Sequence, residues 1–211
     1  MIFKGGTALR RCHFEDYRFS ENLDFTLINN IARADVLKEF KTIFTWVKDE
    51  SGIVFDHARQ DPDSENSYTF YLSYIGPLPG APREVKVDVT FREVILTPIE
   101  DKSIIRTYEE YDDFIPGLKI KVYSLAEVAI EKICALFSPD RNEPRDLYDI
   151  YNLIKEKGIN ICHLVPDVEE KLKFKGTSFM QRRGEFSKKE KRFEKLWEKR
   201  LSQQMSSLPE F

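Results

Sequence analysis

Two short polar stretches near the start of the chain carry residue types that suit binding of a nucleoside triphosphate through metal ions. Residues 4–7 read Lys-Gly-Gly-Thr before an expected helix at 7–14, and residues 22–24 read Asn-Leu-Asp. A glycine turn at a helix N-terminus offers backbone N–H groups and a positive dipole end to phosphate. Carboxylate oxygens are preferred ligands of Mg²⁺. We therefore expect Gly5, Gly6 and Thr7 to contact phosphate and Asp24 to bind metal.

A second carboxylate stands in the same alternating phase on another expected strand, residues 83–91. Asp88 shares its face with polar residues, while valines alternate on the other face. Asp24 occupies the polar face of a similar pattern at 22–27. If the two strands are neighbours, both carboxylates project to one side. Two divalent ions about 3.5–4 Å apart can then hold the attacking and leaving oxygens, with Asp88 as a metal ligand and as the base for an acceptor hydroxyl.

Further charged candidates follow on two expected helices, 124–137 and 144–157. Lys132 lies among apolar residues and could reach phosphate as a point charge, or extend its ammonium to solvent. Arg145 and Asp149 are four residues apart and could pair on one helix face. Asp149 is a further catalytic candidate, whereas Asp146 could simply favour the helix start through its charge.

Composition limits the class of protein. The chain has 211 residues, 41% of them hydrophobic, so a sizeable core is expected. No apolar run is long enough to span a bilayer and no signal peptide is evident. Three widely spaced cysteines favour a reducing cytoplasm, and with three scattered histidines they argue against a zinc site.

Charge is unevenly distributed along the chain. Residues 171–200 hold twelve Lys or Arg and four Glu, a balance of +8, which leaves about −11 elsewhere because the total is −3. Such asymmetry indicates either a nucleic-acid contact or a solvated helix face. As candidate RNA-binding residues we take four cations of this segment, Arg182, Arg183, Lys188 and Lys189.

The periodicities predict an α+β chain whose composition changes near residue 117. Domain 1–117 is expected to hold strands at 22–27, 53–58, 68–75, 83–91 and 94–106, with a helix at 34–50 ended by Gly52 and a loop at 76–82. Region 118–211 is expected to be helical, at 124–137, 144–157, 161–173 and 185–205. Ser124 and Glu127 form the pattern of a capping box.

These residues resemble the AbiEii/AbiGii toxin family of nucleotidyltransferases, within the DNA polymerase beta-like superfamily. The similarity covers roughly residues 1–155, in the order of the family's motifs. The matching stretches are residues 3–9 (FKGGTAL), 18–25 (RFSENLDF), 87–89 (VDV), 131–132 (EK) with 135–136 (AL), and 145–149 (RDLYD).

The resemblance implies a nucleotidyltransferase-type mixed sheet with flanking helices, followed by a helical C-terminal half. It implies Mg²⁺- or Mn²⁺-dependent transfer of a nucleotide from an NTP, in some members to tRNA, with an antitoxin partner and a role in phage defence. The implied roles are catalytic for Asp24, Asp88, Lys132 and Asp149; nucleotide-binding for Lys4, Gly5, Gly6, Thr7, Ser20 and Lys132; and metal-binding for Asn22, Asp24 and Asp88.

Two departures from the family pattern leave alternatives open. Family members carry Asp where this chain has Asn22, and an amide oxygen brings no negative charge to a cation. The chain is therefore either an active enzyme, a catalytically impaired binding module, or a transferase for small molecules. Relatives also carry a helix before the glycine turn that is absent here, which predicts exposed apolar surface and self-association.

Overall fold

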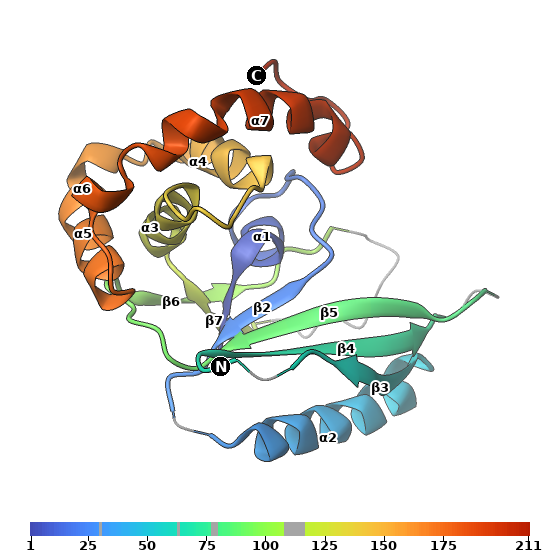
Figure 1. The fold of residues 1–211 in the computed structure, drawn as a ribbon. Helices are drawn as coiled ribbons and strands as arrows, with labels where there is room; N and C mark the ends of the chain where they lie inside the picture. Colours follow the sequence, from blue (N-terminus) through green and yellow to red (C-terminus); the bar gives the residue numbers. More distant parts are fainter. Residues whose placement is uncertain (30, 63, 77–79, 108–116) are drawn as a thin grey trace. The chain divides into compact units, whose positions relative to one another are not determined.

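The protein is described here by a computed structural model, shown in Figure 1. It describes residues 1–29, 31–62, 64–76, 80–107 and 117–211. Two compact units are present. Unit 1 comprises residues 1–16, 20–93 and 101–122, and unit 2 comprises residues 17–19, 94–100 and 123–211. The chain thus passes into unit 2 for three residues, 17–19, before returning to unit 1.

A seven-stranded mixed sheet forms the framework, and the predicted α+β class is confirmed. The strand order is β3-β4-β5-β2-β1-β7-β6. β2 pairs in parallel with β5, and β1 in parallel with β7, whereas β1/β2, β3/β4 and β4/β5 are antiparallel. The strands are β1 (Ile2–Lys4), β2 (Leu23–Thr26), β3 (Val54–Gln60), β4 (Ser67–Ile75), β5 (Arg83–Thr90), β6 (Ile99–Ser103) and β7 (Lys119–Tyr123).

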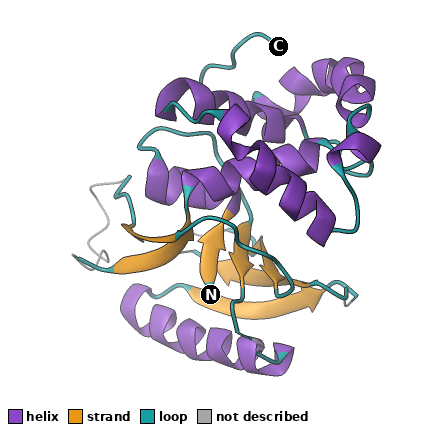
Figure 2. Ribbon diagram, turned by 90° about the vertical axis from the view of Figure 1, so that its left-hand side faces the viewer, coloured by secondary structure: helices purple, strands orange, loops and turns teal. Residues whose placement is uncertain are grey.

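Helix α2 (Arg33–Ser51) covers one face of β3, β4 and β5, and it lies along the sheet in Figure 2. Its apolar residues recur at helical spacing, so Val36 and Phe40 reach the same core as Val87 and Val89 of β5. The helix ends as predicted at Gly52, whose left-handed backbone closes the last turn. Because the valines of β5 face this core, the alternate residues of β5 occupy the opposite face.

The glycine turn begins a short helical segment in unit 1. Helix α1 (Gly5–Ala8) continues into a π-helix, η1 (Leu9–His13). Ala8 and Cys12 pack with Phe3 and Val122. The predicted helix at 7–14 is therefore present but starts earlier, at the glycines themselves.

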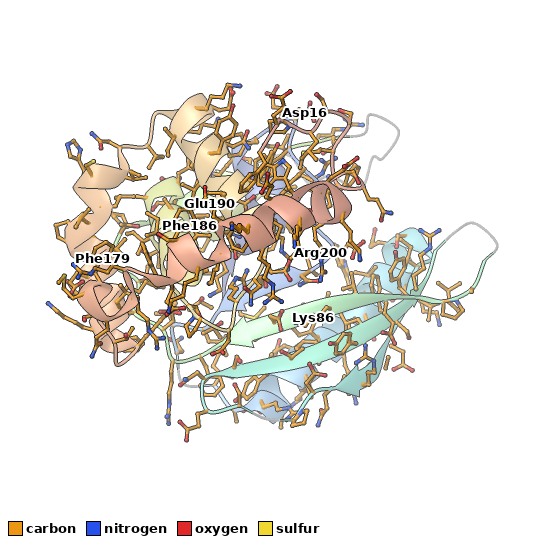
Figure 3. The ribbon with its side chains drawn as sticks, turned by 45° about the horizontal axis from the view of Figure 1, so that its top comes forward. Asp16, Lys86, Phe179, Phe186, Glu190 and Arg200 are labelled. Atoms are coloured by element: carbon orange, nitrogen blue, oxygen red, sulfur yellow. The ribbon has the colours of Figure 1, made fainter. Side chains whose placement is uncertain are left out.

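Unit 2 is helical, as predicted for the C-terminal half. Ser124 caps α3 by accepting a hydrogen bond from the Glu127 N–H, and Gly158 ends α4 in a left-handed conformation. Leu136, Ile150 and Phe193 form a core cluster with Phe186 of α7 packed against it (Figure 3). The helices are α3 (Leu125–Leu136), α4 (Pro144–Lys157), η2 (Ile161–Leu164), α5 (Val165–Phe174), α6 (Phe179–Arg182) and α7 (Glu185–Leu201).

Several local predictions differ from the structure. β7 and α6 were not predicted, and strand character at 94–106 is confined to β6. Glu127 does not complete the capping box, because its carboxylate accepts hydrogen bonds from the N–H groups of Leu96 and Thr97 instead. The predicted loop at 76–82 and the composition change at Pro116 include residues 77–79 and 116, which lie outside the described residues. Among the described helices, none is long and apolar enough to cross a membrane.

Candidate active site

The two predicted metal-binding aspartates are direct neighbours in the sheet. Strands β2 and β5 run parallel, and their register places Asp24 opposite Asp88. Residues directly opposite each other on adjacent strands share a face of the sheet, so the two carboxylates project to the same side. The row extends to Lys4 on β1 and to Thr69 on β4. The condition on which the carboxylate pair depended, that the two strands are neighbours, is therefore met.

The glycine turn lies directly against the Asp24 carboxylate. Gly5 has φ +76°, and a Cβ atom placed on it would lie 2.3 Å from Asp24 Oδ2 and 2.9 Å from Asp24 Cγ. Only glycine combines a left-handed backbone with such a close approach. The start of α1 and the carboxylate of β2 therefore occupy one small region, which is the arrangement that a phosphate and its cation require.

Thr7 fixes the loop that precedes β2. Its hydroxyl donates to the backbone carbonyl of Asn22, and a longer contact of 3.5 Å joins it to the Ser20 carbonyl. The Thr7 side chain therefore holds the loop, while the backbone N–H groups of the α1 start are the phosphate-binding candidates. Lys4, at the N-cap position of α1, contributes no side-chain hydrogen bond to that helix start.

Asp88 is held by two side chains that the sequence did not single out. The Thr69 hydroxyl donates to Asp88 Oδ1 at 2.5 Å, and Lys86 Nζ lies 2.8 Å from Asp88 Oδ2. Lys86 stands two residues before Asp88 on β5 (Figure 3) and therefore shares its face. The sequence alternation already placed Lys86 and Asp88 on one face. The Thr69 contact depends on the β4/β5 register, which the sequence does not reveal.

Lys132 and Asp149 lie in unit 2, where they belong to a buried ion cluster. Lys132 Nζ is 2.7 Å from both Asp146 Oδ1 and Asp149 Oδ2. Arg18 donates two hydrogen bonds to Asp149, from Nε to Oδ1 at 2.6 Å and from Nη2 to Oδ2 at 2.7 Å. The predicted pairing of Arg145 with Asp149 is wrong: Arg145 Nε lies 3.6 Å from Oε2 of Glu143, the N-cap residue of α4.

The cluster keeps its groups charged at neutral pH. Burial alone raises the pKa of Asp149, but the Arg18 guanidinium and the Lys132 ammonium hold it well below the usual range. Burial lowers the pKa of Lys132, and the two carboxylates outweigh that effect and raise it. Asp146 is not merely a helix-start charge, because it is 1% exposed and also accepts from Arg141.

The predicted RNA-binding cations differ in their exposure. Arg183 and Lys188 are exposed and Arg182 is half-buried. Lys189 is buried, and its ammonium donates to the backbone carbonyls of Leu136, at 3.0 Å, and Arg141, at 2.8 Å. Lys189 thus closes the C-terminal end of α3 inside unit 2, and we remove it from the predicted RNA surface.

The residues of the sheet row fit a divalent cation. Asp24 and Asp88 supply two carboxylates on one face, and Asn22 precedes β2 on the loop that Thr7 holds. Among the described residues, no group of three His, Cys, Asp or Glu side chains gathers in a way that could hold a metal. A cation here would therefore depend on two carboxylates, an amide oxygen and the phosphates of the substrate.

Solved structures with a similar fold are known. Among solved structures, JHP933 from Helicobacter pylori is similar with a TM-score of 0.55 and 22% identity, covering 92% of this chain and 72% of that one. The nucleotidyltransferase toxin MenT4 from Mycobacterium tuberculosis is similar with a TM-score of 0.51 and 26% identity, covering 70% of this chain and 48% of that one. A search of curated proteins gave no match.

The family comparison covers the complete sequence. The model described as "Nucleotidyl transferase AbiEii toxin, Type IV TA system" matches residues 1–211. The match includes the glycine turn, both strands of the carboxylate pair and the helices of unit 2. With the sheet row and the glycine turn described above, it establishes that the chain belongs to the AbiEii nucleotidyltransferase toxin family of type IV toxin–antitoxin systems.

Proposed function

We propose that this protein transfers a nucleotide from an NTP to the 3′ end of an RNA, with tRNA as the acceptor class. The observation that carries the proposal is that Asp24 lies opposite Asp88 on paired strands, next to the glycine turn at Gly5. The acceptor hydroxyl oxygen forms a bond to the α-phosphorus of the NTP. The bond from that phosphorus to the bridging oxygen breaks, and pyrophosphate leaves.

Each group of the site has a distinct task in this proposal. Asp24, Asp88 and the Asn22 amide oxygen would hold Mg²⁺ or Mn²⁺, which when bound offsets phosphate charge. The backbone N–H groups at Gly5 and Gly6 orient the phosphates. Asp88 accepts the proton of the acceptor hydroxyl. Lys86 and Thr69 hold the Asp88 carboxylate in a single orientation, at 2.8 and 2.5 Å.

The exposed cations of α7, together with Arg183 just before this helix, are our proposed RNA contact. Phe193, Trp197 and Leu201 are the buried stripe of this helix, so lysines and arginines occupy the exposed positions between them. Phosphate contacts of this kind make binding salt-dependent, with a slope of about 0.7 per contact for single strands. Reversing the charges of Arg183 and Lys188 should lower RNA affinity and flatten the salt dependence.

A matched control for the α7 reversals lies on α2. Lys38 and Lys41 are exposed cations of unit 1, so their reversal changes net charge by the same amount at a different surface. Equal loss of RNA binding in both variants would contradict a specific α7 surface. Nucleotide transfer to a small molecule that neither variant changes, without transfer to RNA by the wild type, would favour a small-molecule acceptor instead.

As a family member the protein is a toxin, and we propose that a cognate antitoxin restrains it in phage defence. The experiment for the catalytic proposal uses labelled NTPs, Mg²⁺ and total tRNA with the full chain. Label transfer is expected with the wild type and is expected to fall at least 100-fold in Asp24→Ala and Asp88→Ala, roughly the loss of a major electrostatic group. Unchanged metal and NTP binding in both variants would refute the site assignment.

A second candidate function rests on Asn22. An amide brings no negative charge to a cation beside an anionic substrate, so the chain would bind nucleotide or antitoxin without turnover. Asn22→Asp separates the two possibilities. If the wild type transfers no label while Asn22→Asp does, the natural protein is an impaired enzyme. If both bind NTP and neither transfers label, the protein is a binding module.

A further inference from the structure

The sheet face that carries Asp88 continues beyond it onto β4 and β3, which follow β5 in the sheet of unit 1 (Figure 1). Thr69 of β4 lies opposite Asp88, and Tyr71 lies opposite Lys86. Because residues i and i+2 of a strand share a face, Tyr71 lies on the same face as the carboxylate pair. It is a diagonal neighbour of Asp88, a relation that separates residues by about 7–8 Å. An aromatic side chain therefore lies beside the candidate active site.

A β-bulge in β3 turns Arg59 onto this same face. His57 pairs with Leu72 and Arg59 pairs with Tyr71, so two steps along β3 match one step along β4. Strict alternation would place Arg59 on the face of His57 and Leu72, which is the face covered by α2. A bulge re-aims the side chain that follows it. The extra residue of β3 thus places the Arg59 guanidinium on the face of Asp88.

Arg59 and Tyr71 form a stacked pair, which we call the stacking pair. Arg59 Cζ lies 3.3 Å from the centre of the Tyr71 ring, as for a guanidinium packed flat on an aromatic face. Arg59 Nη2 donates to Glu84 Oε2 at 3.1 Å, and Nη1 lies 3.9 Å from Asp61 Oδ1. The Tyr71 hydroxyl donates to the other oxygen of Asp61, at 3.3 Å. Both planes are therefore held by other side chains, while the Arg59 side chain remains 52% exposed.

The chemistry of the stacking pair suits a nucleobase better than a phosphate. Asp61 and Glu84 carry more charge than Arg59 alone, so the local balance does not favour an anion. Ion pairs between side chains as exposed as these contribute little to stability, so stability gives little reason for the arrangement. What the pair offers is a flat guanidinium surface backed by an aromatic ring. Unpaired bases stack on aromatic rings and on guanidinium planes.

The stacking pair lies on the acceptor side of the candidate site. The strands run in the order β1, β2, β5, β4 and β3. The glycine turn contacts Asp24 of β2, and the stacking pair lies beyond Asp88 in the opposite direction. In the proposed reaction the glycine turn orients the NTP phosphates and Asp88 accepts the proton of the acceptor hydroxyl. The acceptor nucleotide is therefore on the side of Asp88 that faces the stacking pair.

We infer that Arg59 and Tyr71 bind the 3′-terminal nucleobase of the acceptor RNA by stacking. This inference rests on the proposed function, because Asp88 is what places the acceptor hydroxyl. The stacked base positions that hydroxyl and takes no part in bond formation. Since every nucleobase has a π-face, the pair should accept any terminal base. It should discriminate against an acceptor whose terminal nucleotide has no base.

The test combines protein variants with a change in the RNA. Arg59→Gln removes the exposed guanidinium. Arg33→Gln is its matched control in unit 1, because Arg33 lies over the ring of Tyr68, at 5.7 Å, and Tyr68 pairs with Val89 on the opposite face. Binding of 5′-labelled tRNA to the full chain is measured by fluorescence anisotropy. Arg59→Gln should weaken binding about 10–100-fold, the loss expected for one stacked base, and Arg33→Gln should keep the wild-type affinity.

A tRNA with an abasic 3′ nucleotide makes the test specific to stacking. The wild type should bind this RNA about 10–100-fold more weakly than the intact RNA. Arg59→Gln should show no further loss with it, since both changes remove the same contact. Tyr71→Leu should behave like Arg59→Gln, whereas Tyr71→Phe keeps the ring and should retain most of the affinity. Urea unfolding checks that each variant is folded, and the KM for NTP should stay at the wild-type value.

The outcomes distinguish failure of the stacking role from failure of the proposed function. Losses from Arg59→Gln and from the abasic RNA that multiply would place the terminal base elsewhere and overturn the stacking role. A raised KM for NTP with unchanged RNA affinity would assign the pair to the NTP base, and would also overturn it. Equal binding of both RNAs by a wild type that transfers label would overturn the stacking role alone. Base-dependent binding in the predicted pattern, without label transfer to RNA, would support the stacking role and overturn the proposed function.

Discussion

Replacing Gly5 by alanine tests the glycine turn and the Asp24 carboxylate together. The new Cβ would lie 2.3 Å from Asp24 Oδ2, where ordinary contact begins at 3.4 Å. The carboxylate must therefore move by about 1 Å, and a misplacement of this size near reacting groups lowers rates about 100-fold. The left-handed backbone at φ +76° adds a destabilisation of about 1 kcal/mol for a residue with a Cβ. We expect Gly5→Ala to fold and to lose about 99% of its transferase activity.

Gly52→Ala is the matched control in the same unit. Gly52 has φ +71°, and a Cβ there meets nothing within 4 Å. Gly52→Ala therefore has the same strain from a left-handed backbone as Gly5→Ala, but it lacks the steric clash with a carboxylate. Both variants are compared by urea unfolding and by label transfer from NTP to tRNA. Equal activity in the two variants would refute the argument that Gly5 is required by Asp24, and a larger activity loss in Gly52→Ala would refute it more directly.

Two other predictions follow from buried titratable groups. Asp149 has a folded-state pKa below its ordinary 3.8, so its stabilisation is complete above pH 3.8 and is lost progressively as pH falls from 3.8 toward that lower folded-state pKa. Asp149→Asn should lower the free energy of unfolding at pH 7 by about 3–5 kcal/mol, because Arg18 and Lys132 lose a charged partner. In urea titrations near pH 3, the difference in unfolding free energy between wild type and variant should be smaller. A difference that does not change with pH would contradict the assignment. Burial raises the pKa of the Cys12 thiol to about 11, so maleimide at pH 7.5 should label exposed Cys162 first in the native protein, as peptide mass mapping would show. Equal labelling rates would contradict the buried position of Cys12.

The sheet row was predictable because its signals are local. Period-two alternation places Asp24 and Asp88 on polar faces without knowledge of the fold, although it leaves open whether their two strands are neighbours. The helix at 34–50 and its end at Gly52 follow from equally local rules. Strand β7 escaped prediction because its alternation of lysines with Ile120 and Val122 extends over only four residues. The α+β class therefore followed from the sequence, while the seven-strand order did not.

The ion cluster of unit 2 was not predictable, because its partners are distant in the chain. Arg18 and Asp149 are 131 residues apart, and Lys171 and Glu127 are 44 apart. From the sequence, Arg18 is one cation among many. The spacing of four between Arg145 and Asp149 predicts a local helix pair instead, and the structure does not contain that pair. Helix spacing indicates which residues share a face, but not whether that face is buried. Burial decided the pairing here.

Burial also changes the meaning of the basic segment. Of its twelve cations, Lys171 is paired with Glu127 inside unit 2 and Lys189 is bound to backbone carbonyls. Ten cations and four glutamates remain for the surface, so the local balance falls from +8 to about +6. The two buried lysines have structural roles, since an ammonium without solvent must be fully hydrogen-bonded. A nucleic-acid surface on this segment must therefore be built from the exposed positions of α7, between the buried residues Phe193, Trp197 and Leu201.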